Sequence, residues 1–375
     1  MTLARLALLP DFAEEQWPSM DLAAEQLLLG LRSGHADRFD AQFARPPFFH
    51  FTTRLLGQRG PAKNVNRLLN RFVTYPRFAR KISHDFDLFH LCDHSYSQVI
   101  HSLPASRTGV FCHDLDTFRC LLDPAADPRP RWFRAMATRI LRGMQKAAIV
   151  FHATLAVRSQ IEKYGLIDPA RLVHAPLGVA AEFFGRTAME SAPLKSTLLH
   201  VGSCIPRKRI DVLINVLTAV KQQMPEIRLI QIGGEFTPAQ RQQIAECGVE
   251  NLITQSRGLT RSELAQMYRS ASLVLIISEA EGFGLPVAEA LASGAAVLAS
   301  DIPVLREVGG NAAAYAPVAD VQAWAQKVMD MLRTPDAAPD RAIRLKWGER
   351  YSWQSHAAII TGAYARLLET RNSET

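Results

Sequence analysis

Two glutamates, Glu281 and Glu289, frame a glycine-bearing loop in the second half of this 375-residue chain. The loop follows the apolar run 273–277 and leads into a helix-like stretch that begins near Pro286. A helix N-terminus offers free N–H groups and the positive end of its dipole, so this position favours an anion such as a diphosphate. Glu289 is placed to accept hydrogen bonds from ribose hydroxyls beside that diphosphate. The alternative is that Glu289 only stabilises the helix dipole.

A pair of cations follows another strand-like run, 197–201. Gly202 ends this run, and Arg207 and Lys208 come shortly after it. In doubly wound sheets, ligands bind at the carboxyl ends of the strands. A guanidinium contacts phosphate oxygens in two places and an ammonium adds a point charge. We therefore expect both cations to bind the diphosphate; the alternative is an ordinary pair of surface cations.

The elements that must position these residues alternate between strand and helix. The second half contains strand-like runs at 197–201, 227–232, 272–277, 295–299 and 312–315, and helix-like stretches at 211–222, 238–247, 261–270, 286–293 and 321–332. The first half contains strand-like runs at 4–9, 88–92, 109–112, 148–152 and 172–175, and helix-like stretches at 22–31, 97–103, 132–145 and 155–164. Asp211 and Thr260 are the expected N-caps of two helices. This alternation predicts an α/β fold with two doubly wound parallel sheets, joined near 184–196, followed by a packed helical tail at 341–371.

Composition narrows the class of protein. The chain is 48% hydrophobic and 21% charged, which fits a folded globular protein and argues against disorder. No apolar run approaches the length of roughly 18–20 residues that a membrane-spanning helix needs. The five cysteines are odd in number and widely spaced, without a Cys-x-x-Cys pair, so we expect a reducing cytoplasm and no thiolate zinc site.

The positive charge is concentrated in the first half. The net charge is +7, and residues 1–200 hold 25 Lys and Arg against 18 Asp and Glu, whereas the rest holds 18 of each. Between Asp40 and Asp85 there are nine basic residues and no acidic one. Apolar side chains interleave with the cations over 54–81, which suits an amphipathic segment on an anionic bilayer. Such a mix also suits single-stranded nucleic acid or a solvated basic face, but nothing else in the chain supports nucleic acid.

Residues 281–294 resemble the paired-glutamate motif of family-4 retaining glycosyltransferases of GT-B fold (glycosyl transferases group 1). The resemblance extends to 296–301 and 305–313, to 200–203 and 206–209 upstream, to the glycines at 233–234 and 258, and more weakly to 87–90, 113–114 and 176–179. The first 80 residues match poorly. The resemblance therefore covers most of the chain, and its motif is much more specific than a lone Gly-x-Gly.

The resemblance implies two Rossmann-like domains facing across a cleft. Residues 1–190 would bind the acceptor, 191–345 would bind the nucleotide sugar, and the helices of 346–375 would cross back to the first domain. The implied reaction transfers a hexose, with retention, from a nucleotide diphosphate sugar to a glycan or lipid-linked acceptor in cell-surface polysaccharide or glycoconjugate synthesis. No metal and no cofactor is implied. The implied location is cytoplasmic or peripheral at the inner membrane.

The resemblance also assigns site residues. The expected catalytic residues are His113, Arg207, Lys208 and Glu281. The expected donor-binding residues are Gly202, Ser203, Arg207, Lys208, Arg257, Gly258, Glu281, Gly282, Phe283, Gly284, Leu285 and Glu289. His113 would steady a sugar hydroxyl or the leaving phosphate, although an ordinary loop histidine is the default among 11 histidines. Ser203 departs from the family, which often has arginine there, and Arg207 would take over that duty.

The first loop departs from the family as well, since it lacks the glycine-rich turn of relatives. Asp11 and Trp17 would hydrogen-bond and stack on an acceptor sugar, or would be a loop acid and a packed aromatic.

Three rival interpretations stay open. Two Asp-x-Asp triplets, at 85–87 and 114–116, would imply a metal-dependent enzyme of another fold. A GT-B nucleotide-sugar epimerase and a non-catalytic nucleotide-sugar binding module are the other two.

Overall fold

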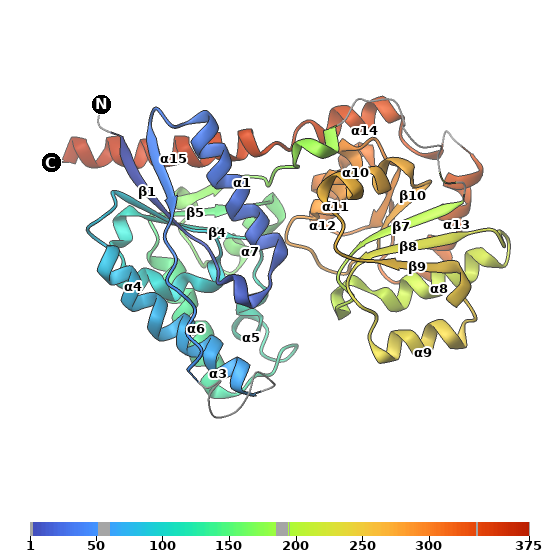
Figure 1. The fold of residues 1–375 in the computed structure, drawn as a ribbon, viewed down its shortest axis with the longest axis horizontal. Coiled ribbons are helices and arrows are strands. Elements are labelled where there is room, and N and C mark those ends of the chain that lie inside the picture. Colours follow the sequence, from blue (N-terminus) through green and yellow to red (C-terminus); the bar gives the residue numbers. More distant parts are fainter. Residues whose placement is uncertain (1–2, 52–60, 185–193, 195, 335–336, 375) are drawn as a thin grey trace. The chain divides into compact units, whose positions relative to one another are not determined.

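The computed structural model describes residues 3–51, 61–184, 194, 196–334 and 337–374. The chain divides into two compact units. Unit 1 comprises Met1–Leu177 and Trp353–Thr375, and unit 2 comprises Gly178–Ser352. In each unit a parallel sheet lies between helices (Figure 1).

The sheet of unit 1 has the strand order β2-β1-β3-β4-β5-β6, and all its pairs are parallel. Its strands are β1 (Ala4–Leu9), β2 (Phe39–Phe43), β3 (Leu88–Leu91), β4 (Thr108–Cys112), β5 (Ile149–His152) and β6 (Leu172–His174). The inner strands β3, β4 and β5 are buried along their whole length, because helices cover both faces of a parallel sheet. Their carboxyl ends therefore meet at one edge.

Helices surround this sheet and include the end of the chain. The α-helices are α1 (Pro18–Gly34), α3 (Pro61–Leu69), α4 (Tyr75–Ile82), α5 (Arg119–Leu122), α6 (Arg131–Lys146), α7 (Leu155–Lys163) and α15 (Trp353–Glu374). A π-helical segment, η2 (Asn70–Thr74), links α3 to α4, and the 3-10 helices are η1 (Ala13–Glu15), η3 (His94–Ser102), η4 (Ala105–Arg107), η5 (Asp116–Phe118) and η6 (Pro169–Arg171). Helix α6 packs against η3, and α1 packs against α15.

The sheet of unit 2 has the order β12-β11-β10-β7-β8-β9 and is also wholly parallel. Its strands are β7 (Thr197–Gly202), β8 (Arg228–Gly233), β9 (Ile253–Ser256), β10 (Leu273–Ile276), β11 (Val297–Ser300) and β12 (Ala314–Ala316). Its helices are α8 (Ile210–Lys221), α9 (Pro238–Glu246), α10 (Arg261–Ser270), α11 (Leu285–Ala292), α12 (Pro303–Gly309), α13 (Val321–Arg333), α14 (Arg341–Gly348), and the 3-10 helices η7 (Ala181–Phe184), η8 (Pro206–Lys208), η9 (Glu250–Leu252) and η10 (Gly310–Ala312).

The predicted α/β class with two doubly wound sheets is confirmed. Thr260 caps α10 through a reciprocal capping box with Glu263, as the sequence predicts. The prediction that Asp211 caps α8 is wrong: Arg209, at φ 47°, precedes the helix, and Asp211 lies in its first turn bound to Arg209. The predicted linker at 184–196 lies almost wholly outside the described residues.

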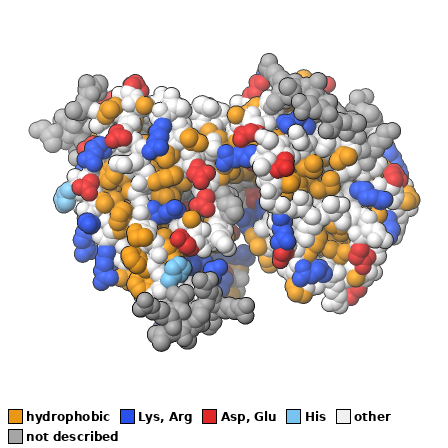
Figure 2. Space-filling model, viewed as in Figure 1, with side chains coloured by type: hydrophobic (Ala, Val, Ile, Leu, Met, Phe, Trp, Pro, Cys, Tyr) orange, Lys and Arg blue, Asp and Glu red, His pale blue; other side chains and the backbone are white. Residues whose placement is uncertain are grey.

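Charges of both signs share the surface. On the face drawn in Figure 2, Asp and Glu side chains are interspersed among Lys and Arg in both units. None of the described helices combines the length and the apolar character needed to cross a bilayer.

Candidate functional site

The first group of predicted site residues lies at the carboxyl edge of the unit 2 sheet. Strands β10, β7 and β8 are neighbours, so the segments that follow Ile276, Gly202 and Gly233 emerge side by side. The backbone N–H of Glu279 donates to the carbonyl of Arg207 at 2.9 Å, which ties two of these segments together.

The centre of this edge is the carboxylate of Glu281. Arg207 contacts its Oε2 through Nη1 at 3.2 Å, the Lys208 ammonium donates to its Oε1, and the Ser278 hydroxyl donates to the same oxygen at 2.6 Å. Arg207 Nη1 also donates to the carbonyl of Ala280 at 2.9 Å. Glu281 is therefore held by both cations from a position more than seventy residues away in sequence.

The ionisation of Glu281 follows from these contacts. Burial alone would raise the pKa of its carboxyl, but Lys208 and Arg207 outweigh burial and lower the pKa below its usual range. Two cations and one carboxylate leave this cluster with one unneutralised positive charge. The Lys208 side chain is 10% exposed and that of Arg207 is 34% exposed, so the guanidinium is the more accessible to a ligand.

His200 lies beneath this cluster on β7. Burial lowers the pKa of its imidazole to about 3, and the Lys208 charge adds to the shift. It is neutral at physiological pH and adds no charge of its own. In the sequence, His200 was noted only as part of the resembling stretch 200–203, and no role was predicted for it.

The glycine loop turns sharply into α11. Gly284 has φ +90° and precedes the helix, and a Cβ there would lie 2.7 Å from Leu305 Cδ2. A side chain at this position would thus be strained and crowded. The helix begins at Leu285, with Gly282 partly exposed in the turn before it. Phe283 is 5% exposed and packs edge-on against Tyr351, so the side chain holds the loop to the core and leaves only its backbone for a ligand.

Glu289 lies in α11, about one turn after the helix begins. The hydroxyl of Tyr268, from α10, donates to Glu289 Oε2 at 3.0 Å. Burial raises the pKa of the Glu289 carboxyl to about 7, against the opposing effects of Tyr268 and Arg261. Tyr268 itself is completely buried. Tyr268 was not predicted as a site residue, because its only signal in the sequence is an aromatic residue on the apolar side of a helix.

Two glutamines brace the loops on the other side of this edge. Gln231, buried on β8, donates to the carbonyl of Gly202 at 2.9 Å, and Gln255 donates to Gln231 and to the carbonyl of Gly234. A Cβ on Gly234 would lie 2.4 Å from the backbone N of Cys204, so only glycine allows these loops to approach. The available signal in the sequence was a glutamine in the middle of an apolar strand, but no prediction was based on it.

The remaining donor-side residues are exposed. Ser203 follows β7 and is exposed, and its surroundings in the described structure indicate no specific role for its side chain. Arg257 forms an ion pair with Glu235, and both side chains are more than half exposed. Gly258, at φ +70°, has open space where a side chain would be. Contact of Arg257 and Gly258 with a nucleobase stays a prediction.

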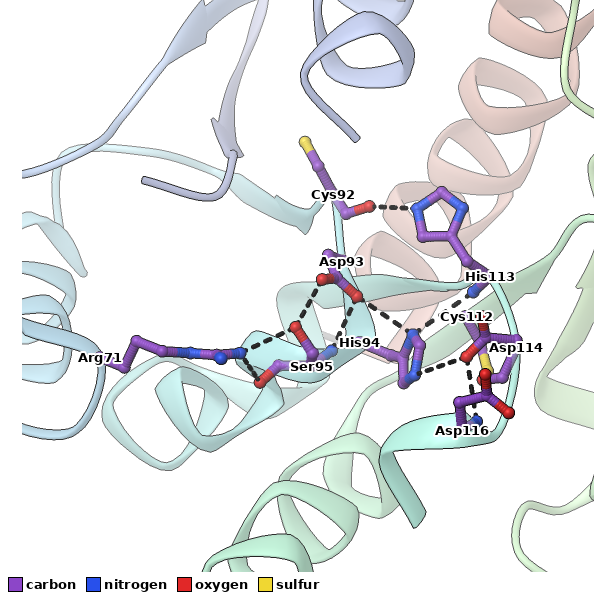
Figure 3. A network of polar contacts seen from close by, with 9 residues as sticks. All are labelled: Arg71, Cys92, Asp93, His94, Ser95, Cys112, His113, Asp114 and Asp116. Carbon is purple, nitrogen blue, oxygen red and sulfur yellow. Dashed lines mark hydrogen bonds and ion pairs between the residues drawn. The ribbon is translucent and has the colours of Figure 1, made fainter. Parts of the chain in front are cut away.

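The second group lies at the carboxyl edge of the unit 1 sheet, after β1, β3 and β4. Figure 3 shows the residues that follow β3 and β4. His113 follows β4, and its Nε2 lies 2.9 Å from the carbonyl oxygen of Cys92. Because a carbonyl can only accept, Nε2 carries the proton and Nδ1 keeps a lone pair. Burial lowers the pKa of His113, although Asp93 opposes the shift, so the ring stays neutral at physiological pH.

Asp93 and His94 form a buried ion pair beside His113. His94 Nδ1 lies 3.1 Å from Asp93 Oδ1, and its Nε2 lies 3.8 Å from Asp114. Burial favours the neutral forms of both groups, but their mutual contact lowers the pKa of Asp93 and raises that of His94. The N–H and hydroxyl of Ser95 also donate to Asp93, at 2.8 and 2.5 Å. The backbone N of His113 lies 3.4 Å from the same Nδ1 of His94, so the pair packs directly against the loop that carries His113.

Asp11 and Trp17 are placed very differently. Asp11 is 3% exposed, and neither of its carboxylate oxygens has a hydrogen-bond partner in the described part of the chain. Burial raises its pKa well above the usual value, and nearby Asp93 adds to the shift. Trp17 is 48% exposed, with the guanidinium of Arg67 5.7 Å from its ring. Acceptor binding by these two residues stays a prediction; in this structure only Trp17 presents its side chain to solvent.

The Asp-x-Asp triplets have structural partners. Asp87 accepts the backbone N–H of Arg5 at 2.8 Å, and Asp114 accepts that of Asp116 at 3.0 Å. Among the described residues, no group of three or more His, Cys, Asp and Glu side chains is placed to hold a metal ion. Metal independence and the lack of a cofactor stay predictions.

Part of the basic stretch 54–81 serves the interior of unit 1. Arg71 donates to the carbonyl and hydroxyl of Ser95 at 2.7 and 2.8 Å and lies 4.2 Å from the ring of Tyr96. Arg67 pairs with Glu15 at 2.8 Å. Residues 54–60 lie outside the described part, and membrane contact by this stretch stays a prediction.

Residues 184–348 match the family model described as glycosyl transferases group 1. The matched segment lies within unit 2. It contains the Glu281 cluster, the glycine loop and Glu289, so the family match and the geometry of the unit 2 edge coincide.

The similarities to curated proteins and solved structures are consistent with the family-model match. The chain is 30% identical over 263 residues to MMP alpha-(1->4)-mannosyltransferase of Mycolicibacterium hassiacum, covering 64% of this chain and 58% of that protein. It is 26% identical over 297 residues to the serotype-specific mannosyltransferase WbdA of Escherichia coli, covering 74% of this chain but only 36% of that protein. The chain thus spans less than two thirds of either relative.

The sucrose-phosphate synthase structure from Thermosynechococcus elongatus superposes with a TM-score of 0.76 at 16% identity, covering 98% of this chain and 100% of that one. This likeness concerns the fold, and it confirms the expected GT-B class.

Proposed function

We propose that this protein is a retaining, metal-independent glycosyltransferase that transfers a hexose from a nucleotide diphosphate sugar to a glycan or lipid-linked acceptor. The transfer would serve the synthesis of a cell-surface polysaccharide or glycoconjugate on the cytoplasmic side. The observation that carries the proposal is the cluster of Arg207, Lys208 and Glu281 beside the N-terminus of α11.

The cluster suits a leaving diphosphate. Its surplus positive charge and the free N–H groups of the helix start would stabilise the negative charge that develops as the glycosidic bond breaks. Glu281 keeps both cations in place before the ligand arrives, which avoids reorganisation during the reaction. Glu289, with one oxygen bound to Tyr268, would accept a ribose hydroxyl with the other.

Retention fits a front-face reaction. The bond between the anomeric carbon and the phosphate oxygen would break, that phosphate oxygen would take the proton of the acceptor hydroxyl, and the acceptor oxygen would bond to the anomeric carbon on the face from which the phosphate leaves. The protein then supplies positioning and electrostatic stabilisation and needs no nucleophile. His113, with the lone pair of Nδ1 free, would accept a sugar hydroxyl.

Mannose is the hexose we propose first, because both relatives described above are mannosyltransferases by name. The base of the nucleotide is the next unknown. A thermal-shift screen against UDP, GDP and ADP identifies it, since a ligand that binds the native state raises the melting temperature.

Product analysis tests the function. The protein is incubated with nucleotide sugars, with and without mannosyl and lipid-linked acceptors, and products are separated by mass and anomeric NMR. Acceptor-dependent release of nucleotide with an α-linked product from an α-linked donor supports the proposal. Free epimerised sugar would identify an epimerase, and binding without turnover would identify a binding module. Full activity in EDTA is expected; loss of activity restored by a divalent cation would contradict metal independence.

A further inference from the structure

The rotation of α6 about its own axis is fixed by close packing. Ile140 and Met144 are buried in the core of unit 1. A Cβ on Gly143 would lie 1.9 Å from the carbonyl oxygen of Ser97 in η3, so glycine lets the two backbones touch. The helix therefore presents one defined side to solvent.

That side is strongly basic. Helix α6 contains five cations and no acid, and all five are exposed: Arg131, Arg134, Arg139, Arg142 and Lys146. At 3.6 residues per turn they fall within an arc of roughly 140° on a helix about 24 Å long. Within the part of the chain that the structure describes, no ion pair neutralises any of these five side chains.

Neighbouring acids do not compensate this charge. Asp127, in the loop before the helix, already pairs with Arg129 at 2.8 Å, and Asp123 accepts the backbone N–H of Ala126. Arg131 lies in the first turn, where the helix dipole disfavours a cation. The dipole favours a cation only at Lys146 in the last turn, so helix stability does not account for Arg131, Arg134 and Arg139.

A large aromatic side chain borders the basic side. Trp132 is 60% exposed and is the most exposed of the large hydrophobic side chains in the described residues. Tryptophan beside a row of cations is typical of segments that lie at the interface of a bilayer. Single-stranded nucleic acid would need several stacking aromatics between the cations, and this side of α6 offers one.

We infer that the outward side of α6, with its five cations and Trp132, binds the anionic surface of a lipid bilayer. This surface differs from the stretch 54–81, where Arg67 and Arg71 serve interior contacts. The inference does not depend on the proposed transfer reaction.

Co-sedimentation with vesicles tests it. The protein is mixed with phosphatidylcholine vesicles with and without phosphatidylglycerol, at low and high salt. Each cation near an anionic surface contributes about fivefold in affinity, so the triple reversal R134E/R139E/R142E is expected to lower binding at least about 100-fold. The matched control is R77E/R80E/K81E on α4, which reverses three exposed cations and changes the net charge equally.

Three outcomes would overturn the inference. They are equal loss from both triple variants, undiminished binding by the α6 variant, and equal binding to vesicles without phosphatidylglycerol. A blue shift of tryptophan emission on vesicles, lost in Trp132→Ala and kept in Trp17→Ala, supports insertion of Trp132. Preference for a single-stranded oligonucleotide over vesicles would assign the surface to nucleic acid instead. Nucleotide-sugar turnover on a soluble acceptor, measured in parallel, tests the transfer reaction separately.

Discussion

The carboxyl edges of the two sheets differ in charge balance. In unit 2, Arg207 and Lys208 share the single carboxylate of Glu281, so one positive charge is left over. In unit 1, the pair of Asp93 and His94 is internally neutral, and His113 beside it is neutral as well. We therefore expect the unit 2 edge to favour an anion and the unit 1 edge to favour an uncharged hydroxyl.

The buried carboxyls show the same contrast. Lys208 and Arg207 overcome burial and lower the pKa of Glu281, whereas no cation does so for Asp11 and its pKa is raised. Burial alone therefore does not decide ionisation; a partner within contact distance does.

The largest expected effect is on catalysis at the unit 2 edge. Lys208→Ala removes one of the two cations proposed to bind the diphosphate and leaves the Glu281 carboxylate paired with Arg207 alone. We expect kcat to fall about 10³-fold, since one preorganised electrostatic contact is worth roughly that much. Steady-state kinetics measure it, with Lys327→Ala, an exposed cation on α13, as the control. Unchanged kcat in K208A would remove the cluster from the mechanism.

The next effect concerns the stability of unit 1. Asp93→Asn breaks a buried ion pair and should cost about 3 kcal/mol in the free energy of unfolding. The lowered pKa of Asp93 stabilises the native state above its unfolded value of 3.8, and the raised pKa of His94 does so below its unfolded value of 6.5. The difference between wild type and variant should therefore be full between these two pH values.

Urea unfolding across pH 3–8 measures this difference. The matched control is Asp114→Asn, because Asp114 lies 3.8 Å from the same imidazole with a side chain that is 32% exposed. We expect a loss of less than about 1 kcal/mol there. Equal losses in the two variants would mean that the Asp93 contact contributes no more to the free energy of unfolding than the Asp114 contact does.

The architecture could be predicted from the sequence because inner parallel strands are continuous apolar runs. The two strands that were not predicted, β2 and β9, are edge strands, one in each sheet. An edge strand is half covered, so Gln255 and Asp40 interrupt the apolar pattern that prediction depends on.

The residues of the candidate site could likewise be predicted only in part. Arg207, Lys208 and Glu281 were identified by their places after strands, but their mutual ion pairs join residues 73 and 74 positions apart and leave no local pattern. Tyr268 and Gln231 were missed for that reason, since only the folded chain brings them to Glu289 and Gly202.

A smaller effect is expected at Glu289. Its pKa of about 7 in the native state exceeds the usual value of 4.5, so the native state binds the extra proton between these pH values. The stability penalty is absent below pH 4.5 and grows as the pH rises to about 7. Glu289→Gln should thus stabilise the protein by on the order of 2 kcal/mol at pH 8 and have no effect near pH 4.5.

Thermal unfolding at the two pH values measures this change. Glu263→Gln is the control of opposite sign, because hydrogen bonds from Thr260 lower the pKa of Glu263, so its carboxylate stabilises the native state as the pH rises. A stabilisation of E289Q that does not depend on pH would contradict the assigned pKa.

The smallest effect tests which nitrogen of His113 faces a ligand. The amide oxygen of Asn can replace the lone pair of Nδ1, whereas Gln reaches the position of Nε2. We expect His113→Asn to keep kcat/KM near the wild-type value and His113→Gln to lose about three- to tenfold, the worth of one hydrogen bond. Nitrogen NMR of labelled histidine should show the proton of the neutral ring on Nε2 at pH 8, because the Cys92 carbonyl can only accept from that nitrogen. A proton on Nδ1 would make His113 a donor, and the unit 1 edge would then resemble the unit 2 edge in favouring an anion.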